Sequence, residues 1–117
     1  MPPLPWSNFA PPFSSVSEAE VLNTSQKFPV ALVKRFDRSP KGARVPFISG
    51  QTFMGLAGTE PSTYVDIAYR LREHGSDPVA DMAELWARMS FSILVQNVDD
   101  HLRNHGFILG KGGKWHL

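Results

Sequence analysis

Residues 96–107 read QNVDDHLRNHGF, and this polar stretch is the part of the sequence from which the fold can be worked out. Nine of the eleven residues 96–106 are polar or glycine, whereas apolar sequence precedes and follows them. Such a composition predicts a loop that a helix enters and a strand leaves. Because binding and catalytic residues concentrate on loops held by rigid elements, we expect the functional site here.

The first of two helices ahead of this loop is predicted over residues 61–74. Its apolar positions fall three and four residues apart, as on a helix with one buried face. Thr59 or Ser62 is expected to cap its start, and Gly75 is a suitable residue just after its end. The residues expected on the inner face are Tyr64, Ile67, Ala68 and Leu71.

The second helix is predicted over residues 78–96, with Asp77 as its N-cap and Pro78 at its first helical position. Its apolar residues again recur at helical spacing. We interpret them as a face packed in the core rather than as a cofactor site. These residues are Val79, Met82, Leu85, Trp86, Met89, Ile93 and Leu94.

Strands are predicted on either side of the helical region. The apolar run at residues 30–33 predicts a buried strand within residues 28–36. Residues 44–48 are expected to return beside it as a second strand, and Pro46 places that strand at an edge.

A β-hairpin is predicted after the polar loop, because two short apolar runs flank the sequence GKGG at residues 110–113. With these four residues as the turn, Leu109 lies opposite Lys114 and Phe107 lies opposite His116. The elements then follow in the order strand pair, two helices, loop and hairpin, which predicts an α+β fold.

The composition excludes several classes of protein. A length of 117 residues predicts one domain. Twelve basic and eleven acidic residues give a net charge of +1, too small for a field that attracts nucleic acid or an anionic membrane, and we expect no direct nucleic-acid binding. The absence of cysteine excludes disulfides, a thiol nucleophile and a cysteine-ligated zinc site. No apolar run reaches the roughly 18 residues of a membrane helix, so we expect a cytoplasmic protein.

The first 17 residues differ from the rest of the sequence. They carry no charge and contain five of the ten prolines. Proline disfavours both helices and the hydrogen-bonded ladders of sheets. We therefore expect a Pro-rich irregular arm over residues 1–27 and a folded domain over residues 28–117.

Asp99 and Asn104 have a spacing that suits phosphoryl transfer. This reaction needs a carboxylate to accept a hydroxyl proton and an amide or carboxylate oxygen for Mg²⁺, and one loop can present both toward the same phosphate. Two alternatives stay open at this point. In the first, His101 and His105 with Asp99 or Asp100 bind the transition metal of a hydrolase. In the second, Asp99 caps a helical turn and the other residues form a solvated loop.

Residues 31–38, ALVKRFDR, and residues 96–107 together resemble the HipA-like serine/threonine kinases of bacterial toxin–antitoxin systems. The resemblance covers roughly residues 28–117. It implies a two-lobed, protein-kinase-like fold, of which this chain resembles the hinge and the first part of the C-terminal lobe. The implied function is transfer of the γ-phosphate of ATP to a serine or threonine of a protein, with ATP and Mg²⁺ as cofactors.

The resemblance also implies roles for six residues. Asp99 matches the catalytic aspartate of a D-x-H-x-x-N motif, His101 matches a histidine that supports the loop, and Asn104 matches the asparagine that binds Mg²⁺. The remaining three match nucleotide-binding positions at the hinge. They are Lys34 and Phe36, which hold the adenine, and Asp37, which lies near the ribose.

The sequence departs from the family pattern at both ends. The phosphate loop and the ATP-contacting lysine of the family precede the position of residue 28, and nothing in residues 1–27 resembles them. The second Mg²⁺-binding aspartate follows a strand similar to KWHL at residues 114–117, and the predicted hairpin would bring it beside Asn104. We therefore expect little or no phosphotransfer from this chain alone.

Two functions follow from these expectations, and the sequence does not decide whether the chain is itself an enzyme. The first is a truncated HipA-like serine/threonine kinase. The alternative is a non-catalytic binding module that docks on a partner kinase or an antitoxin. The expected partners are a HipB-like antitoxin, a complementary kinase fragment and a protein substrate.

Overall fold

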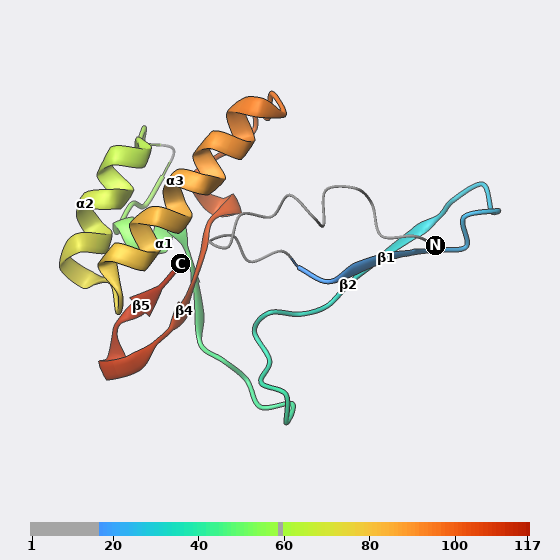
Figure 1. Cartoon of the computed structure of the whole chain (residues 1–117), viewed down its shortest axis with the longest axis horizontal. Helices are drawn as coiled ribbons and strands as arrows, with labels where there is room; N and C mark the ends of the chain where they lie inside the picture. Colours follow the sequence, from blue (N-terminus) through green and yellow to red (C-terminus); the bar gives the residue numbers. More distant parts are fainter. Residues whose placement is uncertain (1–16, 59) are drawn as a thin grey trace.

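A three-stranded antiparallel sheet with helices packed on it forms the main body of the protein (Figure 1). The structure, a computed structural model, describes residues 17–58 and 60–117. The fold is α+β, as predicted. The sheet strands are β3 (Phe47–Ser49), β4 (Gly106–Leu109) and β5 (Trp115–His116), in the order β3-β4-β5. The α-helices of the described residues are α1 (Gly50–Met54), α2 (Tyr64–His74) and α3 (Pro78–Leu94).

The core forms where the helices meet the central strand β4. Phe107 of β4 is fully buried, and its ring stacks on that of Phe53 of α1 with the ring centroids 4.1 Å apart. The other buried apolar residues are Ile67, Leu71, Leu85 and Leu117. Full burial of such a side chain contributes roughly 1.5–3 kcal/mol, so this small cluster is the main source of stability of the body.

Helix α2 begins with a capping box. The Thr63 hydroxyl accepts a hydrogen bond from the backbone N–H of Asp66, and the Asp66 carboxylate accepts one from the N–H of Thr63. The N-cap is therefore Thr63 and not Ser62, because the carboxylate that completes the box lies three residues after Thr63. The other cap expected, Thr59, lies outside the described residues. The predicted inner face is confirmed: two of its four residues are buried, and the other two pack against the core.

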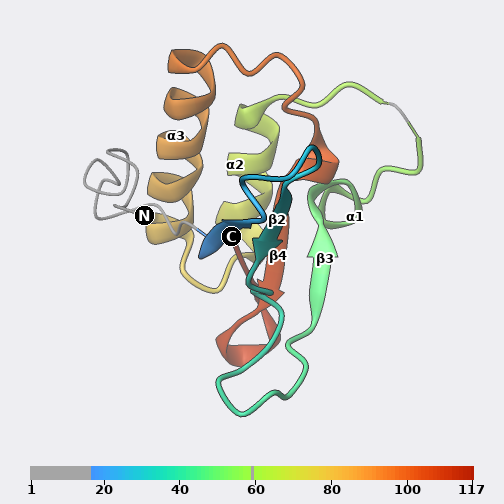
Figure 2. The same cartoon turned by 90° about the vertical axis from the view of Figure 1, so that its right-hand side faces the viewer.

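Helix α3 begins as predicted, with the Asp77 side chain accepting a hydrogen bond from the backbone N–H of Ala80 and with Pro78 at the first position. The prediction that its whole apolar set is buried is wrong. Leu85 is buried, but Trp86 is 67% exposed and Leu94 is 81% exposed. Among the described residues, α2 is the element packed along α3, and it covers only one side of that helix (Figure 2).

The hairpin after the loop forms, but its register differs from the prediction by one residue. Leu109 pairs with Trp115 and not with Lys114. The backbone N–H of Gly110 donates to the carbonyl oxygen of Lys114, so the turn contains three residues rather than four. Continuing this register sets Phe107 opposite Leu117. Because opposite residues share a face of the sheet, this shift brings two buried apolar side chains together.

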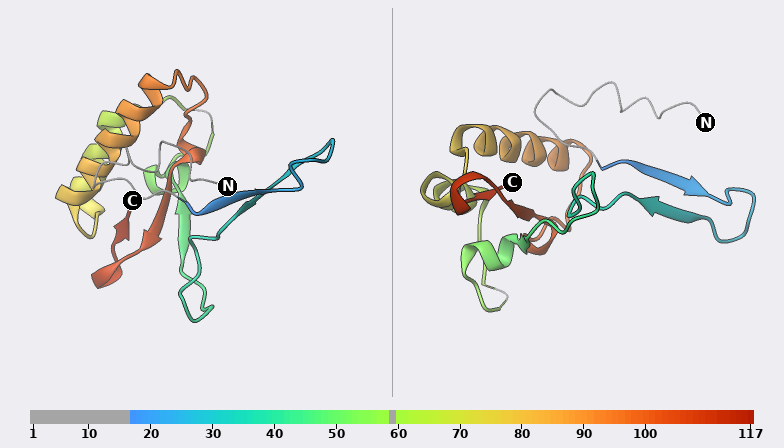
Figure 3. Two further views of the ribbon diagram at one scale, coloured as in Figure 1. Left: turned by 45° about the vertical axis from the view of Figure 1, so that its right-hand side comes forward. Right: turned by 90° about the horizontal axis from the view of Figure 1, so that it is seen from below.

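A second, two-stranded sheet projects away from the body (Figures 1 and 3). It consists of β1 (Ala19–Leu22) and β2 (Val30–Val33), paired antiparallel with Ala19 opposite Val33. All eight residues of this ribbon are exposed. The strand at residues 30–33 is therefore confirmed, but the prediction that it is buried is wrong.

The pairing of the strands also differs from the prediction. The strand expected at residues 44–48 begins at Phe47 and pairs with β4, not with β2. It lies at the edge of its sheet, as Pro46 indicates. The partner of β2 is β1, which lies within the segment 1–27 that was expected to be irregular. The most proline-rich part of that segment, residues 1–16, lies outside the described residues.

None of the helices found in residues 17–58 and 60–117 combines the length and the apolar character needed to cross a bilayer.

Candidate functional site

The polar loop lies where α3 ends and β4 begins (Figure 1). Gln96 has a φ of 54°, in the left-handed region, so the chain turns sharply after the helix. The loop ends in a short 3₁₀ helix, Leu102–Asn104. The backbone N–H of Gly50, the first residue of α1, donates to the carbonyl oxygen of His105 over 2.7 Å. The loop is thus fixed at both ends by regular elements.

Asp99, His101 and Asn104 lie close together within this loop. The Asn104 side-chain N–H donates to the backbone carbonyl oxygen of Asp99 over 2.7 Å. The His101 ring nitrogen Nε2 lies 4.0 Å from a carboxylate oxygen of Asp99. The Asp99 side chain is 88% exposed, so its carboxylate faces solvent while Asn104 holds its backbone.

Asp100, the next residue, has the opposite environment. Its side chain is only 14% exposed. One carboxylate oxygen lies 3.1 Å from Nε2 of His105. The other accepts hydrogen bonds from the hydroxyl of Tyr64 on α2 and, over 3.2 Å, from that of Ser92 on α3. Asp100 therefore connects the loop to both long helices.

His105 is buried, with 5% of its surface exposed. Burial lowers the pKa of His105, because the charged form loses hydration, and the nearby Arg88 lowers it further, while the Asp100 carboxylate acts in the opposite direction. Its Nδ1 atom is buried and has no hydrogen-bond partner among the described residues. Nε2 faces the Asp100 carboxylate at 3.1 Å, so it is the ring nitrogen placed to carry a proton.

This arrangement does not favour a metal hydrolase. His105 points to the interior and His101 lies beside the exposed Asp99, so the two rings do not converge on one cation. In the described part of the chain, no three His, Cys, Asp or Glu side chains are grouped in a way that would hold a metal ion.

The residues fit a Mg²⁺ ion in part. The Asn104 amide nitrogen is engaged with Asp99, which leaves the amide oxygen as the atom for a hard cation. Mg²⁺ commonly binds one or two protein oxygens and completes its shell with water and substrate phosphates. The amide oxygen of Asn104 would supply one such ligand, and the exposed carboxylate of Asp99 lies beside it.

The three expected nucleotide-binding residues follow β2 and already have partners. The ammonium group of Lys34 pairs with Glu18 at 3.0 Å. The Asp37 carboxylate accepts hydrogen bonds from Arg35 and from Arg38. The hydrogen bond from Arg35 lowers the pKa of Asp37 to about 2. No hydrogen bond or ion pair of the described residues joins this segment directly to the loop.

An aromatic contact nevertheless connects the segment to the loop. The ring of Phe36 meets that of Phe47 of β3 edge to face, with the centroids 5.1 Å apart. The Phe47 ring in turn covers Gly106, where it occupies the space that a side chain would need. Gly106 is the first residue of β4, so this contact joins the segment after β2 to the strand that follows the loop.

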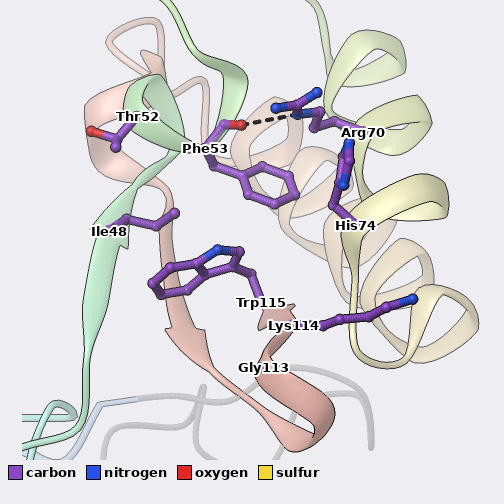
Figure 4. Close-up of a pocket in the computed structure, with 8 residues that line it drawn as sticks. All are labelled: Ile48, Thr52, Phe53, Arg70, His74, Gly113, Lys114 and Trp115. Atoms are coloured by element: carbon purple, nitrogen blue, oxygen red, sulfur yellow. Dashed lines mark hydrogen bonds between the residues drawn. The ribbon is translucent and has the colours of Figure 1, made fainter.

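The described residues line two pockets of about 290 Å³ each that bear on the site. One opens beside the loop, between residues 60–64 and residues 100–103. The other lies between α1, α2 and β5, and none of the loop residues lines it (Figure 4). There Arg70 donates to the backbone oxygen of Phe53, and the indole ring of Trp115 also lines the pocket. The first pocket is therefore the one that belongs to the site.

The sequence model of the HipA-like C-terminal domain matches residues 14–117, which is most of the chain. The protein belongs to the HipA-like family. A search of curated proteins found no match. The family match begins before β1, so the exposed ribbon is part of the HipA-like region. The family assignment agrees with the resemblance seen in the segments at residues 31–38 and 96–107.

In this HipA-like domain, the role of Asp100 and Tyr64 in supporting the loop was not predicted from the sequence. Asp100 was considered only as a metal ligand, and Tyr64 only as a core residue. A usable signal exists in the two adjacent aspartates, because neighbouring side chains in a non-helical segment often point to opposite sides. This alternation would direct one of the two to the interior, where a carboxylate needs hydrogen-bond donors.

Proposed function

We propose that this HipA-like chain supplies the catalytic loop of a serine/threonine protein kinase, with Asp99 as the proton acceptor and Asn104 as a Mg²⁺ ligand. The supporting observation is the exposed Asp99 carboxylate next to Asn104, whose side chain bonds to the Asp99 backbone. A carboxylate that must meet a substrate hydroxyl has to be accessible, and the asparagine beside it has to be held still.

In the proposed reaction, Asp99 accepts the proton of the substrate hydroxyl while that oxygen forms a bond to the γ-phosphorus of ATP. The bond from the γ-phosphorus to the bridging oxygen breaks, and its electron pair leaves with ADP. Bound Mg²⁺ would offset the charge of the phosphate oxygens, with the Asn104 amide oxygen as its ligand on this chain. The pocket beside residues 100–103 is the proposed place for part of the protein substrate.

The hinge positions complete the proposal. Phe36 is 59% exposed and presents an aromatic face of the kind that stacks on adenine. The Asp37 carboxylate already accepts hydrogen bonds from Arg35 and Arg38. Its proposed place near the ribose therefore rests on the position of the hinge backbone. Toxin–antitoxin function, a cytoplasmic location and a HipB-like antitoxin as partner are proposed with the kinase activity.

The test is phosphotransfer from γ-labelled ATP, assayed with the chain alone and with the chain co-purified with the products of adjoining reading frames. We expect label on protein serine or threonine in the second sample, and its loss in Asp99→Asn. The control is Glu73→Gln, which replaces an exposed carboxylate on α2 and should keep full activity. Equal activity of Asp99→Asn and the unchanged chain would contradict the assignment.

A second function is favoured by one observation, the exposed apolar surface of α3. Trp86, Phe91 and Ile93 are each more than 60% exposed. Exposed apolar side chains of this size are typical of a surface that another polypeptide covers. The non-catalytic alternative therefore proposes docking on a partner kinase or antitoxin. It predicts a stable complex in the co-purified sample but no labelled product.

A further inference from the structure

We propose that Asp100 is a positioning residue, which orients Asp99 and Asn104 by fastening the middle of the loop to α2, α3 and the start of β4. Its consequence for phosphotransfer rests on the proposed function. The fastening itself is a property of this chain and can be tested without any activity.

The Asp100 carboxylate has three donors from three separate elements. The Tyr64 hydroxyl comes from the first residue of α2, the Ser92 hydroxyl comes from the last turn of α3, and Nε2 of His105 comes from the residue before β4. A carboxylate that is almost buried costs free energy unless it is well supplied with hydrogen bonds. Three donors satisfy that requirement and also fix the carboxylate in place.

The fixed carboxylate determines where its neighbours lie. Asp99 is exposed and Asp100 is enclosed, so the two adjacent side chains leave the backbone on different sides. With Asp100 fastened inward, Asp99 is directed to solvent. The backbone oxygen of Asp99 then remains in place to accept the hydrogen bond from Asn104. Loss of the Asp100 anchor would release this bond first.

Tyr64 and His105 also support one another. The two rings meet edge to face, with their centroids 5.7 Å apart, so both donors to Asp100 are held by packing as well as by the hydrogen bonds they give. Nε2 of His105 lies 3.1 Å from a carboxylate oxygen of Asp100, an acceptor, and Nδ1 has no partner in the described residues, so Nε2 is the nitrogen placed to carry the proton. The proton position is therefore a direct report on whether the Asp100 anchor is intact.

The test uses nuclear magnetic resonance of the full 117-residue chain. Two signals are followed: solvent exchange of the Asn104 side-chain amide protons, and the ¹⁵N shifts that identify the proton-bearing nitrogen of His105. Asp100→Ala should speed the Asn104 exchange roughly fivefold or more, as expected for loss of one to two hydrogen bonds. Asp100→Asn keeps an oxygen for the two hydroxyls, so it should largely restore the slow exchange while the His105 proton moves to Nδ1.

The matched control is Asp81→Asn. Asp81 is a fully buried carboxylate on α3 that accepts a hydrogen bond from the backbone N–H of Leu117 and lies 2.6 Å from Nδ1 of His116, far along the chain from the loop. Asp81→Asn should lower the stability of the protein. The exchange of the Asn104 amide protons and the ¹⁵N shifts of His105 should stay unchanged. If Asp100→Ala does not fold, Ser92→Ala removes one of the three donors and should show the same acceleration to a smaller degree.

Unchanged Asn104 exchange in a folded Asp100→Ala or Ser92→Ala chain would overturn the proposal, as would equal acceleration in Asp81→Asn. Addition of Mn²⁺ to the unchanged chain tests the proposed metal role of Asn104 independently of the positioning role of Asp100. Broadening of the Asn104 signals by Mn²⁺ is expected from its role as a metal ligand. If Mn²⁺ has no effect but the Asp100 variants still accelerate exchange, the positioning of the loop stands and the metal role of Asn104 fails.

Discussion

The Cα of Gly50 faces the backbone carbonyl of Leu102 so closely that a Cβ on Gly50 would lie 2.5 Å from the carbonyl oxygen. The same Cβ would lie 3.2 Å from the Cβ of His105. Helix α1 therefore packs directly against the 3₁₀ helix of the loop, backbone on backbone. Only glycine permits this approach, and it permits the hydrogen bond from the Gly50 N–H to the His105 carbonyl oxygen.

Replacement of Gly50 is expected to be costly. In Gly50→Ala the loop backbone must move away from α1, which should lower the free energy of unfolding by about 1–3 kcal/mol. The matched control is Gly58→Ala, since a Cβ on Gly58 has no atom within 4 Å. Urea denaturation of both variants tests the prediction, and an equal, small change in both would contradict it.

The cap of α2 gives a second prediction. Thr63→Ala removes the hydroxyl that accepts from the Asp66 N–H, and it should reduce stability by about 0.5–2 kcal/mol. Ser62→Ala is the control, because the Ser62 hydroxyl is buried without a hydrogen-bond partner in the described residues. Its loss should be neutral or slightly stabilising. If Ser62→Ala lowered the stability more than Thr63→Ala, the cap would be Ser62 and the prediction would be wrong.

His105 predicts the direction of a pH dependence. Its pKa in the folded chain lies below the ordinary value of 6.5, so the unfolded chain binds more protons at pH values between the two. Stability should therefore fall as the pH decreases through 6.5 and level off below the folded-state pKa. His105→Gln should flatten this slope, whereas His74→Gln, which replaces a half-exposed ring, should leave it unchanged. Denaturation midpoints between pH 5 and pH 8 measure the effect, and a slope that survives in His105→Gln would refute it.

Nucleotide binding by the isolated chain should be weak. The proposed contacts are the hinge at residues 34–37 and one metal ligand, Asn104, and these leave most phosphate contacts unmade. We expect a dissociation constant in the high micromolar range or weaker for ATP with Mg²⁺. Phe36→Ala should weaken it further, and Phe28→Ala, which removes another exposed aromatic ring, should not. Calorimetry that shows tight, Mg²⁺-dependent binding would contradict this prediction.

The sequence predicts best what local rules determine. Asp77 followed by Pro78, and apolar residues spaced around Leu71, depend on neighbours a few residues away, so the start of α3 and the inner face of α2 are as expected. The grouping of Asp99 with Asn104 was predictable for the same reason, since five residues of one loop cannot separate far. The cap of α2 was misplaced by one residue because Ser62 and Thr63 are both good N-caps and only the Asp66 carboxylate distinguishes them.

Long-range pairing could not be predicted in this way. The apolar run at residues 30–33 favours a strand equally well whether it is buried or exposed, and its sequence does not indicate that it pairs with β1. The hairpin register depended on whether Gly110 belongs to the turn or to the strand. Gly112 and Gly113 both take positive φ values, of 68° and 71°, and these allow the tighter three-residue turn. The anchor at Asp100 joins the loop to α2 and α3, and the adjacent aspartates indicate an inward side chain without indicating which helices it meets.

The exposed ribbon of β1 and β2 has a consequence for how the protein loses its structure. Its residues bury little apolar surface, whereas the body holds the entire buried cluster around Phe107. The ribbon should therefore open on its own, far more often than the body, as a separate cooperative unit. The amide protons of Val21 and Ala31 should exchange with solvent through local opening at low free energy. Those of α2 should exchange only on global unfolding. A protease added under native conditions would consequently cut between the strands of the ribbon and leave the loop of Asp99 and Asn104 in a folded remainder.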